Sequence, residues 1–306
     1  MGLSVCLPLA TDCLGREMAA HGTVLFPVAC YHDDLEKMDV PWHWHEELEL
    51  LVVECGAARV CAGGDECLLH PGEGAFINTG VLHGVWASGS GECRLHSIVF
   101  HPRLVGGSVD SILWQKYLEP LLRDPCRPWL AFGHECWQLE AVRAIESAWQ
   151  ACAAEQDGFE FEAREQLSRV IYLLCSRAPA AQKCPTAKRL RDGERMKTML
   201  QYIQSCLTEE LTLSQIAQSA NISPNECLRC FRSTVGNSPI QYVRLLRLQK
   251  AAGLLSETRL PVSDIAAQCG FRELSYFTKI FREWKGCTPS AYRKQKTGQS
   301  PSPPAG

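Results

Sequence analysis

The sequence has no long hydrophobic run. Hydrophobic residues make up 46% of its 306 positions, yet no stretch approaches the roughly 18 consecutive apolar residues of a membrane-spanning helix. The first residues, MGLSVCLPLATDCLGREM, also have no basic segment ahead of an apolar core, so we do not expect a secretory signal. These absences exclude an integral membrane protein and favour a cytoplasmic one.

The cysteines do not have the pattern of a disulfide framework. There are 17 of them, an odd number, and they are scattered along a chain far longer than a small secreted scaffold. We therefore expect reduced thiols.

A strong net charge is also absent, since the formal sum is −3. The charge is unevenly distributed, however. Residues 193–306 hold 15 basic and 8 acidic side chains, a net charge of +7, and the remaining residues carry −10. This asymmetry indicates that the C-terminal part binds a polyanion, and nucleic acid is the leading candidate.

Hydrophobic patterning divides the chain into unlike parts. Short apolar runs bounded by Gly and Pro between residues 20 and 101 predict strands of a sandwich or barrel, and helical periodicity begins near residue 110. The expected helices cover residues 112–122, 136–154 and 161–176. We predict a first domain over 1–177, a linker over 178–193, an all-helical domain over 194–296 and a disordered tail over 297–306.

The helical region begins with a helix-turn-helix pattern. A helix over Leu213–Ala220 precedes a turn at Asn221-Ile222 and a second helix that starts at Ser223. The sequence SPNE at that start is typical of an N-cap serine, a proline in the first turn and a capping-box glutamate. The second helix presents a basic face outward, as a DNA-reading helix does.

A second copy of this pattern follows about 50 residues later. A helix over Val262–Cys269 and a turn at Gly270-Phe271 lead into a helix over Glu273–Trp284. A long helix that begins at Pro239 and carries Arg244, Arg247 and Lys250 joins the copies. An internal repeat of this kind predicts two reading heads on one unit.

These residues resemble the DNA-binding domain of AraC/XylS-type transcription regulators. The resemblance covers about 100 residues and rests on Ser223-Pro224, Arg229, Phe231, Gly236-Asn237-Ser238-Pro239, Gly270-Phe271, Phe277, Phe281, Thr288-Pro289 and Tyr292-Arg293. It implies that the second helix of each motif enters one of two successive major-groove segments of DNA. The positions that would face DNA are Asn225, Leu228, Arg229 and Arg232 in the first helix and Leu274, Ser275, Thr278 and Lys279 in the second.

Cys227 and Cys230 have the spacing of half a zinc site. A zinc finger needs a second pair of ligands at suitable spacing, and no other cysteine of this region supplies one. We interpret both thiols as buried apolar residues. Arg232, Arg244, Arg247, Lys250 and Arg282 are expected to contact phosphates or to pack.

A second constellation lies in the N-terminal domain. His43, His45 and Glu49 alternate along one strand, and their spacing resembles the first motif of the cupin β-barrel. His83, after Gly80, resembles part of the second motif, although Asn78 stands where proline is usual. In enzymatic cupins these four positions bind a metal. We predict instead a metal-free effector pocket lined by Trp42, His43, His45, Glu49, His83 and Trp86, with no cofactor and with Glu49 hydrogen-bonded to a histidine or to an effector hydroxyl.

The resemblance therefore spans most of the chain, with a cupin-like barrel before the double helix-turn-helix. It implies a DNA-binding regulator of transcription, most often an activator, that responds to a small molecule, forms a homodimer and contacts RNA polymerase. The helices over 135–176 are our candidates for the dimer interface; the alternative is that they only cover the barrel. We expect no enzymatic activity. Two alternatives stay open at this point: a metal-dependent cupin enzyme fused to a DNA-binding module, and an architectural DNA binder with no ligand.

Overall fold

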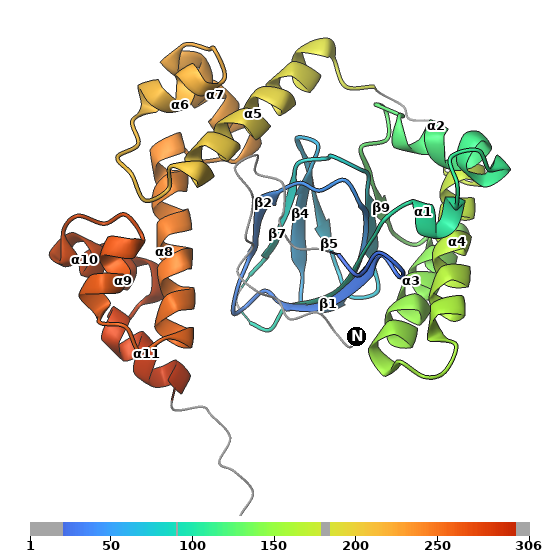
Figure 1. Ribbon diagram of the computed structural model, residues 1–306, viewed down its shortest axis with the longest axis horizontal. Helices are drawn as coiled ribbons and strands as arrows, with labels where there is room; N and C mark the ends of the chain where they lie inside the picture. The colour runs from blue at the N-terminus through green and yellow to red at the C-terminus, as the bar shows by residue number, and fades with distance from the viewer. Residues whose placement is uncertain (1–20, 90, 179–183, 298–306) are drawn as a thin grey trace, which may run out of the picture. The chain divides into compact units, whose positions relative to one another are not determined.

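The computed structural model describes residues 21–89, 91–178 and 184–297 (Figure 1). The chain divides into two compact units, residues 1–194 and 195–306. Among the described residues, no helix is both long and apolar enough to cross a membrane.

The first unit is built on two antiparallel sheets. In spatial order, one contains β1 (Val28–Asp34), β8 (Arg94–Phe100), β3 (Leu48–Cys55), β6 (Gly74–Ile77) and β9 (Trp129–Phe132). The other contains β2 (Val40–His43), β7 (His83–Ala87), β4 (Ala58–Ala62) and β5 (Asp65–Leu69).

The prediction of a sheet-rich, cupin-like first domain is confirmed, although its barrel is not closed. Within the described residues the hydrogen-bonded ladders end at β1 and β9 in one sheet and at β2 and β5 in the other. The two sheets therefore form an open sandwich, because closure would require paired strands at every edge.

Strand β3 shows why the sequence has a continuous apolar run here. Leu51 and Val53 pack between the two sheets, against residues such as Val60 and Val85. Leu50, on the opposite face, packs toward the helices that cover the five-stranded sheet. A strand buried on both faces loses the alternation of apolar and polar residues that marks a half-exposed strand.

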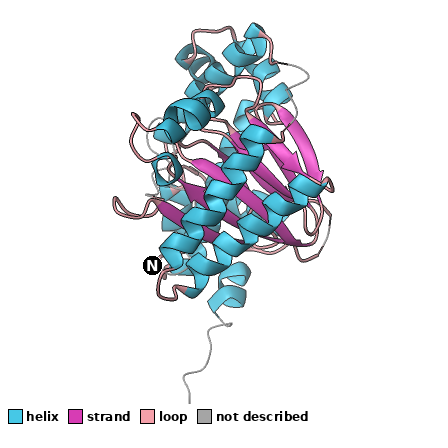
Figure 2. Cartoon of the chain, turned by 90° about the vertical axis from the view of Figure 1, so that its right-hand side faces the viewer, coloured by secondary structure: helices cyan, strands magenta, loops and turns pink. Residues whose placement is uncertain are grey.

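Two long helices cover the outer face of the five-stranded sheet. They are α3 (Cys136–Ala154) and α4 (Phe159–Ser176), and Figure 2 shows them lying across the strands. Ala141, Ile145 and Leu167 belong to the apolar core that they form with the sheet. The helices expected over 136–154 and 161–176 are thus confirmed, with an earlier start in the second.

The helix expected over residues 112–122 is irregular. Short α1 (Arg103–Gly106) is followed by a π-helical turn, η1 (Trp114–Leu118), and by short α2 (Glu119–Leu122). Pro120 explains the break, because proline has no N–H to donate to the carbonyl four residues earlier.

The predicted linker is partly helical. Helix α5 (Ala187–Ser205) begins inside the 178–193 segment, where the sequence AKRLR has high helix propensity despite its polarity. Cys184, just before α5, forms a disulfide with Cys126, with a Cα–Cα distance of 4.2 Å. The expectation of reduced thiols is wrong for this pair, which 58 positions separate in the sequence; the other described cysteines are free.

The second unit is entirely helical over its described residues. After α5 it contains α6 (Leu213–Ser219), α7 (Pro224–Thr234), α8 (Pro239–Glu257), α9 (Val262–Gln268), α10 (Leu274–Lys285) and α11 (Pro289–Thr297). The predicted double motif and its long central helix appear as expected. Apart from Thr297, the predicted disordered tail lies outside the described residues.

Candidate DNA interface and ligand site

The first reading head is the pair α6 and α7. Both helices are capped: Thr212 and Gln215 form a capping box at α6, which was not predicted, and the hydroxyl of the predicted N-cap Ser223 accepts from the Glu226 N–H at 3.2 Å. Glu226 itself departs from the prediction. Its carboxylate does not complete a capping box; it lies 2.8 Å from Arg195 on α5 and 3.4 Å from Arg229.

The turns of the two motifs share one geometry. Asn221 has a φ of 54° and Gly270 a φ of 81°, in the left-handed region. The N–H of the next residue then bonds back to the preceding helix, from Ile222 to Ala217 at 3.1 Å and from Phe271 to Ala266 at 2.9 Å. This closure sets the angle at which α7 and α10 leave their partner helices.

Helix α7 presents most of its predicted DNA residues to solvent. Asn225, Arg229 and Arg232 are exposed and Leu228 is half-buried, whereas Cys227, Cys230 and Phe231 are buried. Burial raises the pKa of the Cys227 thiol to about 11, which keeps it neutral. The interpretation of Cys227 and Cys230 as buried packing residues is confirmed.

Helix α10 repeats this division. Leu274, Ser275 and Lys279 are exposed and Thr278 is half-buried, while Phe277, Ile280 and Phe281 form the inner face. Tyr276 is exposed as well and was not predicted. Tyr276 is three positions before Lys279 and so lies on the same face of the helix, and this spacing could have identified it from the sequence.

Arg247 has a structural role. Its Nε donates to the Leu207 carbonyl at 2.8 Å and its Nη2 to the Glu209 carbonyl at 2.5 Å. Burial lowers the pKa of this guanidinium, as expected for a packed group. Arg247 therefore ties α8 to the segment after α5, which is the packing alternative that the sequence left open.

The N-terminal cluster assembles between the two sheets. His43, His45, Glu49 and His83 are all buried, and one ligand atom from each lies within 4.8 Å of the others. Glu49 Oε2 is 3.2 Å from His45 Nε2 and 2.8 Å from His83 Nε2. The sequence predicted this convergence, and pairing of β2 with β7 produces it by placing His43 opposite His83.

Backbone carbonyls orient the three rings. Nδ1 of His43 contacts the Pro41 carbonyl at 2.8 Å, and Nδ1 of His83 contacts the Val81 carbonyl at 2.7 Å. His45 Nδ1 contacts the Glu47 carbonyl at 3.1 Å. Because a carbonyl only accepts, each Nδ1 carries the proton, and the lone pair of a neutral ring is on Nε2.

The lone pairs on Nε2 of His45 and His83 would repel the nearby Glu49 carboxylate. A cation or a proton must therefore lie between these groups. Burial opposes ionisation of this carboxyl, but charge on His83 and hydrogen bonds from His45 and His83 hold its pKa well below the ordinary 4.5. Three Nε2 atoms and one carboxylate, with the Nδ1 atoms tied to the backbone, also fit a divalent metal ion of the kind that cupins hold. The expectation of a metal-free cluster stays a prediction.

The structure does not place all six predicted pocket residues together. Trp42 and Trp86 pack on each other with ring centroids 5.3 Å apart, and the Arg59 guanidinium lies 5.5 Å from the Trp86 ring. Trp86 is next to Val85, which points into the core between the sheets. Since side chains alternate along a strand, the tryptophan pair faces away from that core, so its assignment to the histidine pocket is wrong.

Other residues were missed or acquire a clear role. His21 is buried, with its ring 5.2 Å from that of His45 and its Nδ1 2.9 Å from the Tyr31 hydroxyl. It lies before β1, outside any periodic pattern that would have marked it. Asn78 is an anchor: its Nδ2 donates to the carbonyls of Leu121 at 2.8 Å and Arg127 at 3.2 Å.

Comparison with known proteins assigns a family to both units. Residues 25–173 match a family model described as an AraC-like ligand binding domain, and residues 216–295 match one described as a helix-turn-helix domain. The uncharacterized HTH-type transcriptional regulator YdeC of Bacillus subtilis (strain 168) is 27% identical over 286 residues, which is 92% of this chain and 97% of YdeC.

Two further likenesses are weaker. The HTH-type transcriptional activator RhaR of Pectobacterium atrosepticum is 27% identical over 53% of this chain and 57% of its own length. The structure of ToxT from Vibrio cholerae aligns over 90% of this chain and 98% of its own at 12% identity, with a TM-score of 0.45. With a ligand-binding domain before a double helix-turn-helix, the chain belongs to the AraC family of DNA-binding transcription regulators.

Proposed function

We propose that the chain regulates transcription by reading two successive major-groove segments of DNA, one with α7 and one with α10. The observation that carries this proposal is the matched pair of helices, each following the same left-handed turn and each exposing polar and basic side chains over a buried aromatic face. Arg229 and Lys279, 50 positions apart, are equivalent in the two heads.

Two variants test the two heads separately. Selection of binding sequences from random duplex DNA with the full chain should give a site with two blocks about one helical turn apart. Arg229→Ala should relax preference in one block and Lys279→Ala in the other, each at a cost of about 1–3 kcal/mol if the side chain contacts a base.

Arg123→Ala, at an exposed arginine just after α2 and outside the proposed dimer region, is the matched control and should leave the site unchanged. An equal loss of affinity for all DNA sequences in both variants would show that Arg229 and Lys279 contact phosphates and not bases. Unchanged selection would contradict the proposed interface.

The histidine cluster is the proposed effector site. A small molecule with hydroxyl or carboxyl groups would pair with Glu49 or with the imidazoles, because buried charge needs a partner. Changing His43 and His83 together to alanine should abolish the response to effector and leave DNA binding intact. A thermal-shift screen of sugars, aromatic acids and small metabolites identifies the effector, since a ligand that binds the native state raises the melting temperature.

A metal-dependent cupin enzyme joined to a DNA-binding domain is the second candidate, and the converging Nε2 atoms favour it. Three imidazoles and one carboxylate would hold iron, manganese or nickel, which supply redox or Lewis-acid chemistry. Near-equimolar metal in untagged protein, lost in the His43/His83 double variant, would select this candidate. We propose the non-enzymatic regulator because the relatives named above are regulators.

We further propose that the protein is a cytoplasmic homodimer that activates transcription through contact with RNA polymerase. The outer face of α4 supports dimerisation through residues 135–176, since Phe161 is 80% exposed and Tyr172 48% exposed on a helix whose other face is buried.

A further inference from the structure

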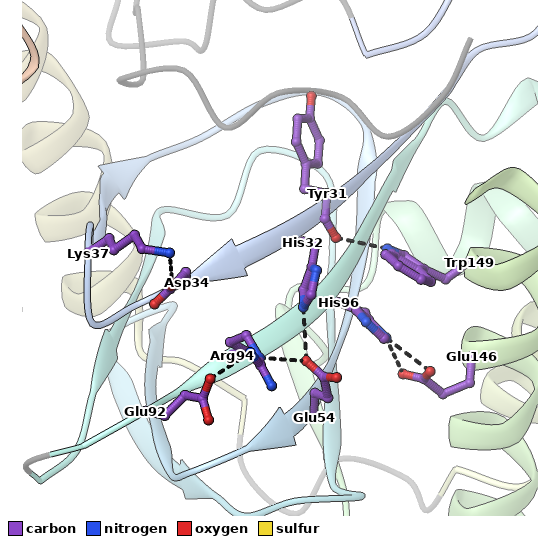
Figure 3. Close-up of polar contacts among 10 residues, drawn as sticks. All are labelled: Tyr31, His32, Asp34, Lys37, Glu54, Glu92, Arg94, His96, Glu146 and Trp149. Atoms are coloured by element: carbon purple, nitrogen blue, oxygen red, sulfur yellow. Dashed lines mark hydrogen bonds and ion pairs between the residues drawn. The ribbon is translucent and has the colours of Figure 1, made fainter. Parts of the chain in front are cut away.

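A second cluster of histidine and glutamate lies on the other face of the five-stranded sheet, against α3 (Figure 3). His32 on β1 and His96 on β8 are direct partners in the antiparallel ladder. Glu54, near the end of β3, completes the group, and one ligand atom from each of the three residues lies within 4.8 Å of the others. The sequence patterns did not group these residues, because only the strand pairing brings them together.

His96 is held in one orientation. Its Nδ1 donates to both carboxylate oxygens of Glu146 on α3, at 3.1 and 3.0 Å, and its ring stacks on Trp149 at 3.6 Å with an interplanar angle of 12°. Trp149 is fixed in turn, since its Nε1 donates to the Tyr31 carbonyl at 2.8 Å. A carboxylate on one ring nitrogen leaves the lone pair on the other, as in histidines that bind metals.

Glu54 is prepared as an anionic ligand. Its Oε2 lies 2.9 Å from His32 Nε2 and 3.0 Å from Arg94 Nε. The hydrogen bond from His32 is the main cause that lowers the pKa of Glu54, and Arg94 adds to it. Arg94 also pairs with Glu92 at 2.6 Å, so it keeps a counter-charge when Glu54 turns to another cation (Figure 3).

We propose that His32, His96 and Glu54 form a site for a divalent transition metal ion of the zinc class, with Glu146 as the positioning residue for His96. Two imidazoles and one carboxylate, with a further position open to water, are a ligand set that zinc accepts, whereas magnesium and calcium prefer oxygen ligands alone. Arg94 is the cation that now pairs with Glu54, and the metal ion would displace it from that carboxylate.

The dimensions allow this site to close. Tetrahedral zinc with bonds of about 2.0–2.2 Å separates its ligand atoms by about 3.3 Å, so the group must contract from its present spread of up to 4.8 Å. His32 and Glu54 can move, because their side chains are 36% and 38% exposed. His96, stacked and bonded to α3, is the fixed point.

This site is separate from the histidine cluster between the sheets. Glu49 and Glu54 are on the same strand, but Glu49 points between the sheets toward His45 and His83, and Glu54 points to the α3 side with His32 and His96. Metal bound at either cluster can therefore be assigned by variants that leave the other intact.

Zinc titration of the full chain tests the proposal, with affinity read by competition against a chromophoric chelator and location read from the histidine-ring NMR signals. We expect zinc to shift the His32 and His96 signals. His32→Gln and Glu54→Gln should each weaken this site at least tenfold, and Glu146→Gln by about 10–100-fold. His70→Gln, an exposed histidine outside the site, is the matched control and should change nothing.

Arg94→Gln gives the sharpest test, because the proposal predicts that this variant binds zinc more tightly than the wild type does. Removal of the competing guanidinium should strengthen zinc binding and leave the His96 signal shift in place, whereas a purely structural ion-pair cluster would show no gain. Zinc that binds equally well in the His32→Gln and Glu54→Gln proteins, or that shifts only the His43, His45 and His83 signals, would overturn the proposal.

Discussion

At the scale of single residues, Glu49 shows how burial and pairing compete. The carboxylate is buried between the sheets, where burial alone would neutralise it, yet contacts with His45 and His83 hold its pKa well below the ordinary 4.5. A group whose pKa is depressed by folding stabilises the native state above its unfolded pKa, and that contribution is lost as the pH falls below it.

Replacing Glu49 with glutamine should therefore destabilise the protein in a pH-dependent way. Near pH 7 we expect a loss of about 3–5 kcal/mol, because the variant removes the buried carboxylate that pairs with His45 and His83. The difference in unfolding free energy between wild type and variant should shrink as the pH falls below about 4.5, where the unfolded carboxyl is protonated. Urea unfolding at several pH values measures it.

Glu46→Gln, at an exposed position three residues earlier, is the control and should lie within about 0.5 kcal/mol of wild type throughout. A Glu49→Gln penalty that stays constant from pH 7 to pH 4 would show that Glu49 is not the ionised partner of the cluster.

At the scale of elements, the turn of each helix-turn-helix decides whether its reading helix is presented correctly. Both turns use a left-handed residue, but they differ in crowding. A Cβ at Gly270 would lie 2.9 Å from the Leu207 carbonyl oxygen and 3.0 Å from Arg247 Nε. Asn221 has the equivalent conformation in the first motif and already carries a side chain.

Gly270→Ala should consequently destabilise the second unit by about 1–3 kcal/mol, from the left-handed strain and the contact with backbone. Asn221→Gly is the matched substitution in the other motif and should be neutral or slightly stabilising, because glycine adopts this φ without strain. Denaturation followed by helix circular dichroism measures both. Equal effects of the two changes would contradict the crowding argument.

At the scale of the whole molecule, the charge division and the structural division nearly coincide. The acidic part ends at about residue 192, and the two compact units meet at residues 194 and 195. We therefore expect DNA to contact the basic unit, because the acidic unit would repel the phosphate backbone.

Binding to DNA should accordingly depend steeply on salt. For six to ten phosphate contacts, affinity should fall about 10³-fold or more between 50 and 200 mM salt. A fragment over 185–297, which keeps α5 with its buried Met196, Met199 and Leu200, should retain this slope. Fluorescence anisotropy with a labelled duplex measures the affinity at each salt concentration. An affinity that does not depend on ionic strength would contradict the assignment of the basic unit as the DNA-binding part.

Self-association should reside in the other unit. Phe161→Asp, on the exposed face of α4, should shift the full chain from dimer to monomer in sedimentation equilibrium without unfolding it, since charge is depleted from the cores of interfaces. Val109→Asp is the control. Val109 is 58% exposed and lies outside α3 and α4, so this change should leave the dimer intact. A dimer that persists in the Phe161 variant would place the interface elsewhere.

The sequence by itself determined the helical half almost completely. Caps, turn residues and a face of buried aromatics are local signals, so Ser223, Gly270 and the helices that follow them could be placed by reading along the chain. The four residues of the inter-sheet cluster were also predictable, because strand alternation and a family spacing marked them.

Only the tertiary structure decided what depends on contacts between distant segments. Glu226 left its predicted cap because α5 brings Arg195 within 2.8 Å, and Cys184 met Cys126 across 58 positions. Trp42 and Trp86 lie on one face of the four-stranded sheet and His43 and His83 on the other, so the tryptophans are separated from the histidine cluster. Pairing of β1 with β8 placed His32 opposite His96, and no local pattern encodes that register because it is fixed by burial of both strands in one sheet.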